Sequence, residues 1–194
     1  CDSLASIKIP STIKNIPVDT FLNCKSLVKV GLGSVETIGK YAFSGVASLH
    51  TLVIGSEADK TERLYKSQLT TITDLAFWKC SALQVVELPM NVKKIGTSAF
   101  KDCTMLKELY VYSRNAVFGD TVVPTTTTIY GATGSTAEAY ANANGNTFVA
   151  IDTEVAAVEQ AYADYIAAIE AAAQLKANTG DTNAQFVFYM SAND

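Results

Sequence analysis

The chain has 194 residues, of which 48% are hydrophobic, and carries a formal net charge of −4 at pH 7. This composition supplies enough apolar side chains for a core and no excess of basic residues that would hold nucleic acid. No run approaches the roughly 18 consecutive apolar residues of a membrane span, and the N-terminus lacks a signal-peptide pattern. We therefore expect a soluble, mildly acidic globular protein without membrane insertion. If it is secreted, its signal has been removed or lies outside this sequence.

The first feature along the chain is an internal repeat, LxxLxL, that occurs five times with an apolar residue in every slot. Alternation at its third to sixth positions predicts a short strand with one face inward, and strands from successive repeats should stack into a parallel sheet. The rows begin at Leu4, Leu27, Leu49, Leu83 and Leu106, with spacings of 23, 22, 34 and 23 residues.

An apolar pair follows each of the first four rows, then an aromatic residue and, three positions later, a cysteine or a valine. We expect these residues to form ladders inside the coil, each resting on its counterpart in the next repeat. The aromatic slot holds Phe21, Phe43, Phe77 and Phe100, and the next slot holds Cys24, Val46, Cys80 and Cys103.

The cysteines, including Cys1 at the same position of a partial repeat, are interpreted as buried residues of one repeat slot. Neighbouring layers would lie within disulfide range, so distance alone permits a bridge. The parallel orientation of ladder side chains argues against one, and four free thiols are expected.

The repeat that begins at Leu49 is about 11 residues longer than its neighbours. Its surplus falls in the charged segment from Gly55 to Gln68, which predicts an exposed loop at one edge of the coil.

A terminal module is predicted at residues 127–151. Ser135 and Glu138 form a capping box before a short helix from Ala137 to Ala143, Gly145 ends that helix, and a strand should follow at Thr147–Ile151. A solenoid needs such a cap to cover its last layer.

From Asp152 the composition shifts to alanine and glutamate, and apolar residues recur at steps of three and four, which predicts a helix of about 25 residues with one narrow apolar stripe. The stripe comprises Val155, Val158, Tyr162, Tyr165, Ile169 and Ala172. It could dock on its own domain, on a partner helix or on a further domain. Gly180 should end the helix, and Gln185–Met190 suggests a strand without a visible partner.

We expect residues 1–151 to form one domain and residues 152–194 to be a separate segment, which could be the start of a further domain in a longer protein.

The sequence gives little support for a catalytic site or a metal site. The cysteines form no CxxC pair and His50 is the single histidine, so neither a zinc set nor a catalytic triad is favoured. We expect His50 to face solvent or an edge, and we expect no enzymatic activity, no metal and no cofactor.

Two stretches, "LQVVELPMNVKKIGTSAFKDCTML" and "LASIKIPSTIKNIPVDTFLNCKSL", resemble BspA-type leucine-rich repeats, in which an apolar strand is followed by Pro, an apolar pair, Ala-Phe and Cys. The second repeat departs from this pattern at Gly33 and Val46. The resemblance covers Cys1 to about Val111, and the terminal module extends it. It implies an α/β leucine-rich-repeat solenoid, a right-handed superhelix of stacked short parallel strands with a C-terminal cap and a following α-helix. It also implies a bacterial cell-surface or secreted protein, since relatives are described as adhesins.

The binding surface should be the outward-facing side chains of the strand rows. The most suggestive cluster is Glu108, Tyr110 and Tyr112, because tyrosines are favoured at recognition surfaces. Alternatively, the segment from Ser113 to Pro124 could shield both tyrosines. We expect a protein or glycan ligand from a host or a neighbouring cell. The alternative is a structural spacer or targeting module attached to another functional domain or anchor.

Overall fold

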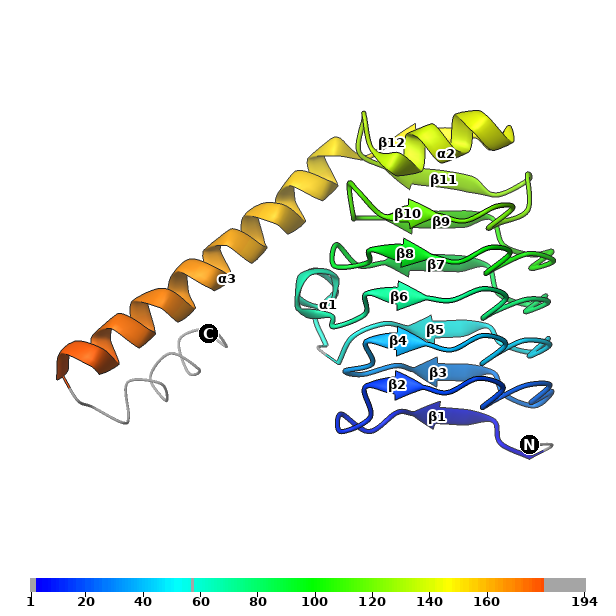
Figure 1. The fold of residues 1–194 in the computed structure, drawn as a ribbon, viewed down its shortest axis with the longest axis horizontal. Coiled ribbons are helices and arrows are strands. Elements are labelled where there is room, and N and C mark those ends of the chain that lie inside the picture. The colour runs from blue at the N-terminus through cyan, green and yellow to red at the C-terminus, as the bar shows by residue number, and fades with distance from the viewer. Residues whose placement is uncertain (1–2, 57, 180–194) are drawn as a thin grey trace.

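The computed structural model describes residues 3–56 and 58–179, which form a solenoid of stacked layers (Figure 1). Each predicted row supplies a strand, and two further strands come from the segment predicted as the cap. The strands of this face are β1 (Ser6–Lys8), β3 (Lys29–Gly31), β5 (Thr51–Val53), β7 (Val85–Leu88), β9 (Glu108–Val111), β11 (Thr128–Gly131) and β12 (Phe148–Ala150). All of their pairings are parallel, as the repeat pattern predicts.

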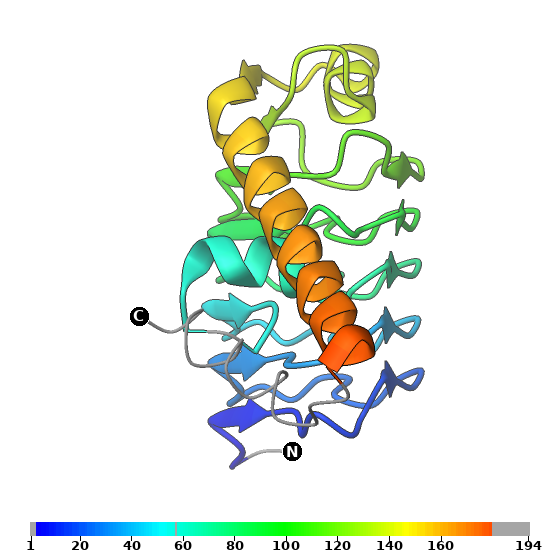
Figure 2. The same ribbon diagram turned by 90° about the vertical axis from the view of Figure 1, so that its left-hand side faces the viewer.

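A second face of the coil is a five-stranded parallel sheet, which lies on the opposite side of the solenoid (Figure 2). Its two-residue strands are β2 (Asn15–Ile16), β4 (Thr37–Ile38), β6 (Thr71–Ile72), β8 (Lys94–Ile95) and β10 (Val117–Phe118). Each of the first four two-residue strands ends at the second member of an apolar pair, which is buried as predicted but was not predicted as a strand. Ile13, the first member of the first pair, is 43% exposed, so the expectation of a buried pair is wrong there. β10 belongs to a further repeat that the LxxLxL pattern alone did not reveal.

The predicted aromatic ladder fills the core between the two faces. The ring centroids of Phe21 and Phe43, of Phe43 and Phe77, and of Phe77 and Phe100 are each 5.0 Å apart, and the rings are stacked. Phe43, Phe77 and Phe100 are completely buried. One aromatic residue per layer therefore ties four consecutive layers together.

The cysteine slot agrees with the ladder only in part. Cys80 and Cys103 are free and buried, and their thiols donate to the carbonyl oxygens of Phe43 (3.1 Å) and Phe77 (3.2 Å). Burial, followed by the hydrogen bond with Cys103, raises the pKa of the Cys80 thiol. Cys24 is buried as predicted but is disulfide-bonded, so the expectation of free thiols is wrong there. Cys1 lies outside the described residues.

Each layer turns through residues with a left-handed backbone, and most of these residues are not glycine. They include Asp19, Asn23, Tyr41, Leu75, Lys79, Ser98, Asp102 and Thr121. This conformation costs an ordinary residue about 1–2 kcal/mol. Hydrogen bonds to the next layer offset the cost: the amides of Leu75, Phe77 and Lys79 donate to carbonyl oxygens one layer on, over 3.0, 2.8 and 3.0 Å.

The long repeat interrupts the strand ladder. β1, β3 and β5 form one sheet and β7, β9, β11 and β12 another, with no pairing between β5 and β7. The inserted segment contains α1 (Lys60–Lys66), whose first turn is capped by the Asp59 carboxylate, which accepts from the Glu62 amide over 2.9 Å. Leu64 and Tyr65 are buried. The prediction of an exposed loop is therefore wrong for α1, because this apolar pair packs against other parts of the chain.

The cap folds as the sequence predicts. α2 (Thr136–Asn144) begins at Ser135, whose hydroxyl accepts from the Glu138 amide, and ends at Gly145 with φ 74°. The Glu138 carboxylate accepts from the Gly134 amide over 2.6 Å. In this capping box the Glu138 side chain therefore bonds to the amide of Gly134, which precedes the N-cap residue, and not to the amide of Ser135 itself. In Figure 1, α2 covers the last layer of the coil.

The long helix α3 (Asp152–Thr179) leaves the cap, contacts α1 and extends obliquely away from the solenoid (Figure 1). The first part of its stripe docks on its own chain: Val155 and Val158 are buried, and Tyr162 and Tyr165 pack against Tyr65 of α1. Ile169, farther along the stripe, is 40% exposed. No helix in residues 3–56 and 58–179 is long and apolar enough to cross a membrane. Residues 180–194, including the predicted stop and strand, lie outside the described residues, and the division at residue 151 stays a prediction.

Two polar contacts fix the start of α3. The Asp152 carboxylate accepts from the hydroxyl and the amide of Thr133, over 2.7 and 2.8 Å, and these bonds lower the pKa of Asp152. Arg114 donates two hydrogen bonds to Glu159, of 2.6 and 3.0 Å. This bidentate pair fixes the direction in which the helix leaves the cap.

Candidate functional site

A pair of stacked tyrosines marks the outward strand face. Parallel pairing places Tyr130 of β11 beside Tyr110 of β9, and Glu87 of β7 beside Tyr110 on its other side. The rings of Tyr110 and Tyr130 lie 4.3 Å apart between centroids and 11° from parallel. Both side chains are half-buried. The two rings therefore form a rigid aromatic platform across adjacent layers.

Glu108, two residues before Tyr110, shares this face. The Tyr110 hydroxyl donates to a Glu108 carboxylate oxygen over 3.0 Å. Burial, and then this hydrogen bond, raise the pKa of Tyr110 to about 12. The phenol is therefore protonated at neutral pH, where it can donate a hydrogen bond but cannot act as a base.

A lysine from the inserted segment reaches the same face. The Lys60 ammonium pairs with Glu87 and lies 5.8 Å from the centroid of the Tyr110 ring. The hydrogen bond to Glu87 is the main cause of a raised Lys60 pKa, and Tyr112 contributes as a further hydrogen-bond partner. Tyr110, Tyr130, Glu108, Glu87 and Lys60 together form what we term the tyrosine face.

Tyr112 does not belong to this surface. It is only 4% exposed, and it packs with Leu64 of α1 and with Val155 and Val158 of α3. Its prediction as an exposed ligand-binding residue is wrong, and the shielding comes from the two helices rather than from the segment Ser113–Pro124. Burial also raises the pKa of Tyr112.

Two members of the tyrosine face were missed by sequence reasoning. Tyr130 occupies in β11 the outward position that Tyr110 holds in β9, so extending the strand alternation into the cap could have found it. Lys60 carries no such signal, because only the folded insertion brings it to the strands.

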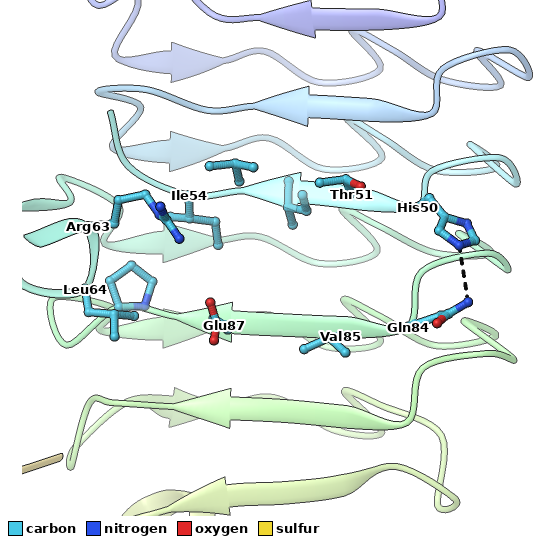
Figure 3. A pocket seen from close by; sticks show the side chains of 11 residues that line it. His50, Thr51, Ile54, Arg63, Leu64, Gln84, Val85 and Glu87 are labelled. Atoms are coloured by element: carbon cyan, nitrogen blue, oxygen red, sulfur yellow. Dashed lines mark hydrogen bonds between the residues drawn. The ribbon is translucent and has the colours of Figure 1, made fainter. Parts of the chain in front are cut away.

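A cleft opens on the strand face where the ladder is interrupted. It has a volume of about 340 Å³ and lies between β5 and β7 (Figure 3). Thr51 and Val53 line it from β5, and Val85 and Glu87 from β7. Leu52, which points inward from β5, is partly exposed, whereas its counterparts in the interior layers on either side are buried. The interruption therefore opens a path from the surface to the core.

The two ends of the cleft differ. At the start of the strands, the Nε2 atoms of exposed His50 and of Gln84 lie 3.2 Å apart in a hydrogen bond (Figure 3). Arg63, Leu64 and Pro89 line the other end, where the strands finish. His50 thus lies at an edge, as predicted.

A second cleft, of about 610 Å³, lies between α1, α3 and the edge of the solenoid, and Tyr65, Tyr162 and Tyr165 line it. The Lys66 ammonium lies 5.0 Å from the Tyr165 ring and 3.1 Å from a Glu62 carboxylate oxygen. These groups already satisfy one another, so we assign them to holding α3 in place. In the part of the chain that the structure describes, no three His, Cys, Asp or Glu side chains gather as metal ligands.

The repeat of Phe, Cys and paired apolar residues coincides with a known family. Residues 1–129 match the model of the BspA type leucine rich repeat region, in six copies. The chain belongs to this family. Six copies exceed the five LxxLxL rows of the sequence and agree with the additional layer of β10 and β11.

Solved structures of other leucine-rich-repeat proteins are similar to this BspA-type chain. The T. pallidum leucine rich repeat protein is 23% identical, with a TM-score of 0.56, over 66% of this chain and 58% of that one. A leucine rich cell surface protein of Faecalibacterium prausnitzii is 25% identical (TM-score 0.44; 66% of this chain, 29% of that one). A leucine-rich repeat protein of Bacteroides ovatus is 20% identical (TM-score 0.46; 68% and 40%).

The first of these likenesses shows the fold. The chain spans less than two thirds of each of these proteins. A comparison with curated proteins found no match.

The BspA-type match places the candidate residues on different parts of the chain. Glu87, Glu108 and Tyr110 lie within the matched array, whereas Tyr130 and α3 lie beyond residue 129. Tyr130 is one residue past the end of the match, on the strand β11 of the last layer.

Proposed function

We propose that this chain is a non-enzymatic binding module of a bacterial cell-surface or secreted protein, with an adhesin-like role. It engages a protein or glycan of a host or neighbouring cell through the tyrosine face. The observation that carries this proposal is the stacked pair Tyr110 and Tyr130, which is half-buried and flanked by charged groups. Family membership and the name of the Faecalibacterium neighbour support a surface location.

The chemistry of the tyrosine face suits recognition. Tyrosine is enriched at protein interfaces, because a rigid amphipathic ring offers contact area and one hydrogen bond at little entropic cost. Contact with Glu108, Tyr130 and Lys60 fixes Tyr110 before any ligand arrives, which reduces the entropy lost on binding.

The proposal is tested by binding of the purified chain to an array of extracellular-matrix proteins and glycans. The variant Tyr110→Ala/Tyr130→Ala should lose at least about tenfold in affinity for any ligand found, because interface tyrosines are frequent hot spots. Tyr41→Ala, in a turn outside the tyrosine face, should bind like the parent chain. Circular dichroism must show that both variants are folded. Undiminished binding by the folded double variant would contradict the assignment of the site.

A structural spacer or targeting module, attached to another domain or an anchor, is the second candidate. It is favoured by the course of α3, which extends away from the coil in Figure 1 and leaves Ile169 of its apolar stripe 40% exposed. A pure spacer would bind nothing on the array, so the same experiment separates that form of the second candidate from the first.

A further inference from the structure

The cleft between β5 and β7 is a wedge, open on one face of the coil and closed on the other. On the opposite face β4 and β6 remain paired in parallel. The centroids of Phe43 and Phe77, one from each side of the interruption, are 5.0 Å apart, as in the intact layers. The layers are therefore in contact at the core and separate only where β5 and β7 would otherwise pair.

Two strand edges face each other across this wedge. Thr51 donates its amide to Val28, and Val53 accepts from Leu32, so both residues bond toward β3. In a parallel strand successive residues bond to opposite sides, which directs the amide and carbonyl of Leu52 into the wedge.

The same alternation applies to β7. Gln84 and Leu88 accept from the chain of the β9 layer, so the backbone groups of Val85 and Glu87 point toward β5. Such edges are templates for an added strand, and a chain placed between them would find donors and acceptors on both sides.

The far end of the wedge carries a cation. Arg63 lies with Leu64 and Pro89 at the carboxyl ends of the two strands. Its guanidinium donates to the Ala58 carbonyl oxygen over 3.0 Å, and no carboxylate among the described residues pairs with it. Glu87 is engaged by Lys60. A chain running parallel to β5 and β7 would bring its own carboxyl end to Arg63.

We propose that the wedge binds the C-terminal end of a partner protein as one added parallel strand. Its backbone pairs with Leu52 on one side and with Val85 and Glu87 on the other, and its terminal carboxylate pairs with Arg63. One apolar side chain of the ligand covers Leu52. Because a strand occupies about 4.8 Å, binding rotates the layers apart about the closed side. This site adjoins the tyrosine face, with which it shares Glu87, and goes beyond the function proposed above.

The probe for this proposal is an N-terminally labelled peptide with the sequence of residues 106–111 of this chain, since a strand of the repeat itself pairs in parallel with its neighbours. Fluorescence anisotropy should show saturable binding of the free-acid form. Binding of the C-terminal amide should be at least about tenfold weaker, as expected when a charge-assisted hydrogen bond is lost. A peptide N-methylated at its central residues should not bind, because it lacks the amides that pair with the edges.

Variants of the protein test which side chains form this site. Arg63→Gln should remove the difference between acid and amide, whereas the matched control Arg114→Gln should retain it. Tyr110→Ala/Tyr130→Ala should bind the peptide normally, so failure of the tyrosine-face proposal would leave this result unchanged. The proposal is overturned by absent binding of the free acid at millimolar concentration, by equal binding of acid and amide to the parent chain, or by undiminished binding of the N-methylated peptide.

Discussion

Replacing Phe77 by alanine should be among the most destabilising single changes in this chain. The ring is completely buried and stacks on both sides, with centroid distances of 5.0 Å to Phe43 and to Phe100. Truncation of a buried phenylalanine costs about 3–5 kcal/mol, and each stacked pair contributes about 0.5–1.5 kcal/mol beyond its buried area. Since two pairs are lost, we expect a cost near the upper end, about 5 kcal/mol. That is a large share of the about 5–15 kcal/mol by which domains are stable.

Phe21→Ala is the matched control. Phe21 occupies the same slot of the repeat, but it is 8% exposed and stacks on Phe43 alone among the described residues. Its loss should cost about 3 kcal/mol, at the lower end of the same range. The difference between the two losses in free energy of unfolding measures how much more a ring contributes when it stacks on two neighbouring layers than when it stacks on one.

Urea unfolding followed by far-ultraviolet circular dichroism gives both free energies of unfolding. Phe77→Leu, which keeps most of the volume but loses both stacked pairs, should cost less than Phe77→Ala, about 1–3 kcal/mol, and keeps the comparison possible if the alanine variant does not fold. Equal losses for Phe77→Ala and Phe21→Ala would refute the stacking argument.

Three further predictions concern ionisable groups. Tyr110 should ionise near pH 12 in an ultraviolet titration; its contribution to stability is present below the ordinary pKa of 10 and is lost as pH rises toward 12, and Glu108→Gln should move its ionisation downward. In the native protein Cys80 and Cys103 should resist thiol reagents, and unfolding without reductant should expose these two thiols but not that of Cys24; a native protein that reacts at once would contradict their burial. The lowered pKa of Asp152 stabilises the fold above its ordinary value of 3.8, and this contribution is lost as pH falls further, so Asp152→Asn should flatten the acid side of a melting-temperature profile.

The repeat made the layers predictable from sequence. A slot such as that of Phe77 or Phe100 recurs at nearly constant spacing because each layer must present the same shape to the next. The cap was predictable for a local reason, since Ser135, Glu138 and Gly145 satisfy the ends of one short helix by themselves.

The candidate site was predictable only in part, because non-repeating segments decide what covers the strands. Strand alternation correctly placed Tyr110 and Glu108 outward, but it also placed Tyr112 there, where α3 buries it. The position of α3 depends on its contacts with Tyr65 and with other residues distant in the sequence. The periodic pattern of the sequence does not predict such contacts. Lys60 likewise reaches Glu87 only because the insertion folds as a helix.

The left-handed turns carry a consequence for how the array assembles. Residues such as Leu75 and Lys79 do not favour that backbone by themselves, and it is held by carbonyl oxygens of the following layer. A single repeat in isolation would therefore lose its turns as well as its buried face. Folding must therefore start from a nucleus of neighbouring layers and propagate layer by layer. Each folded layer then supplies the carbonyl oxygens that hold the turns of the layer next to it.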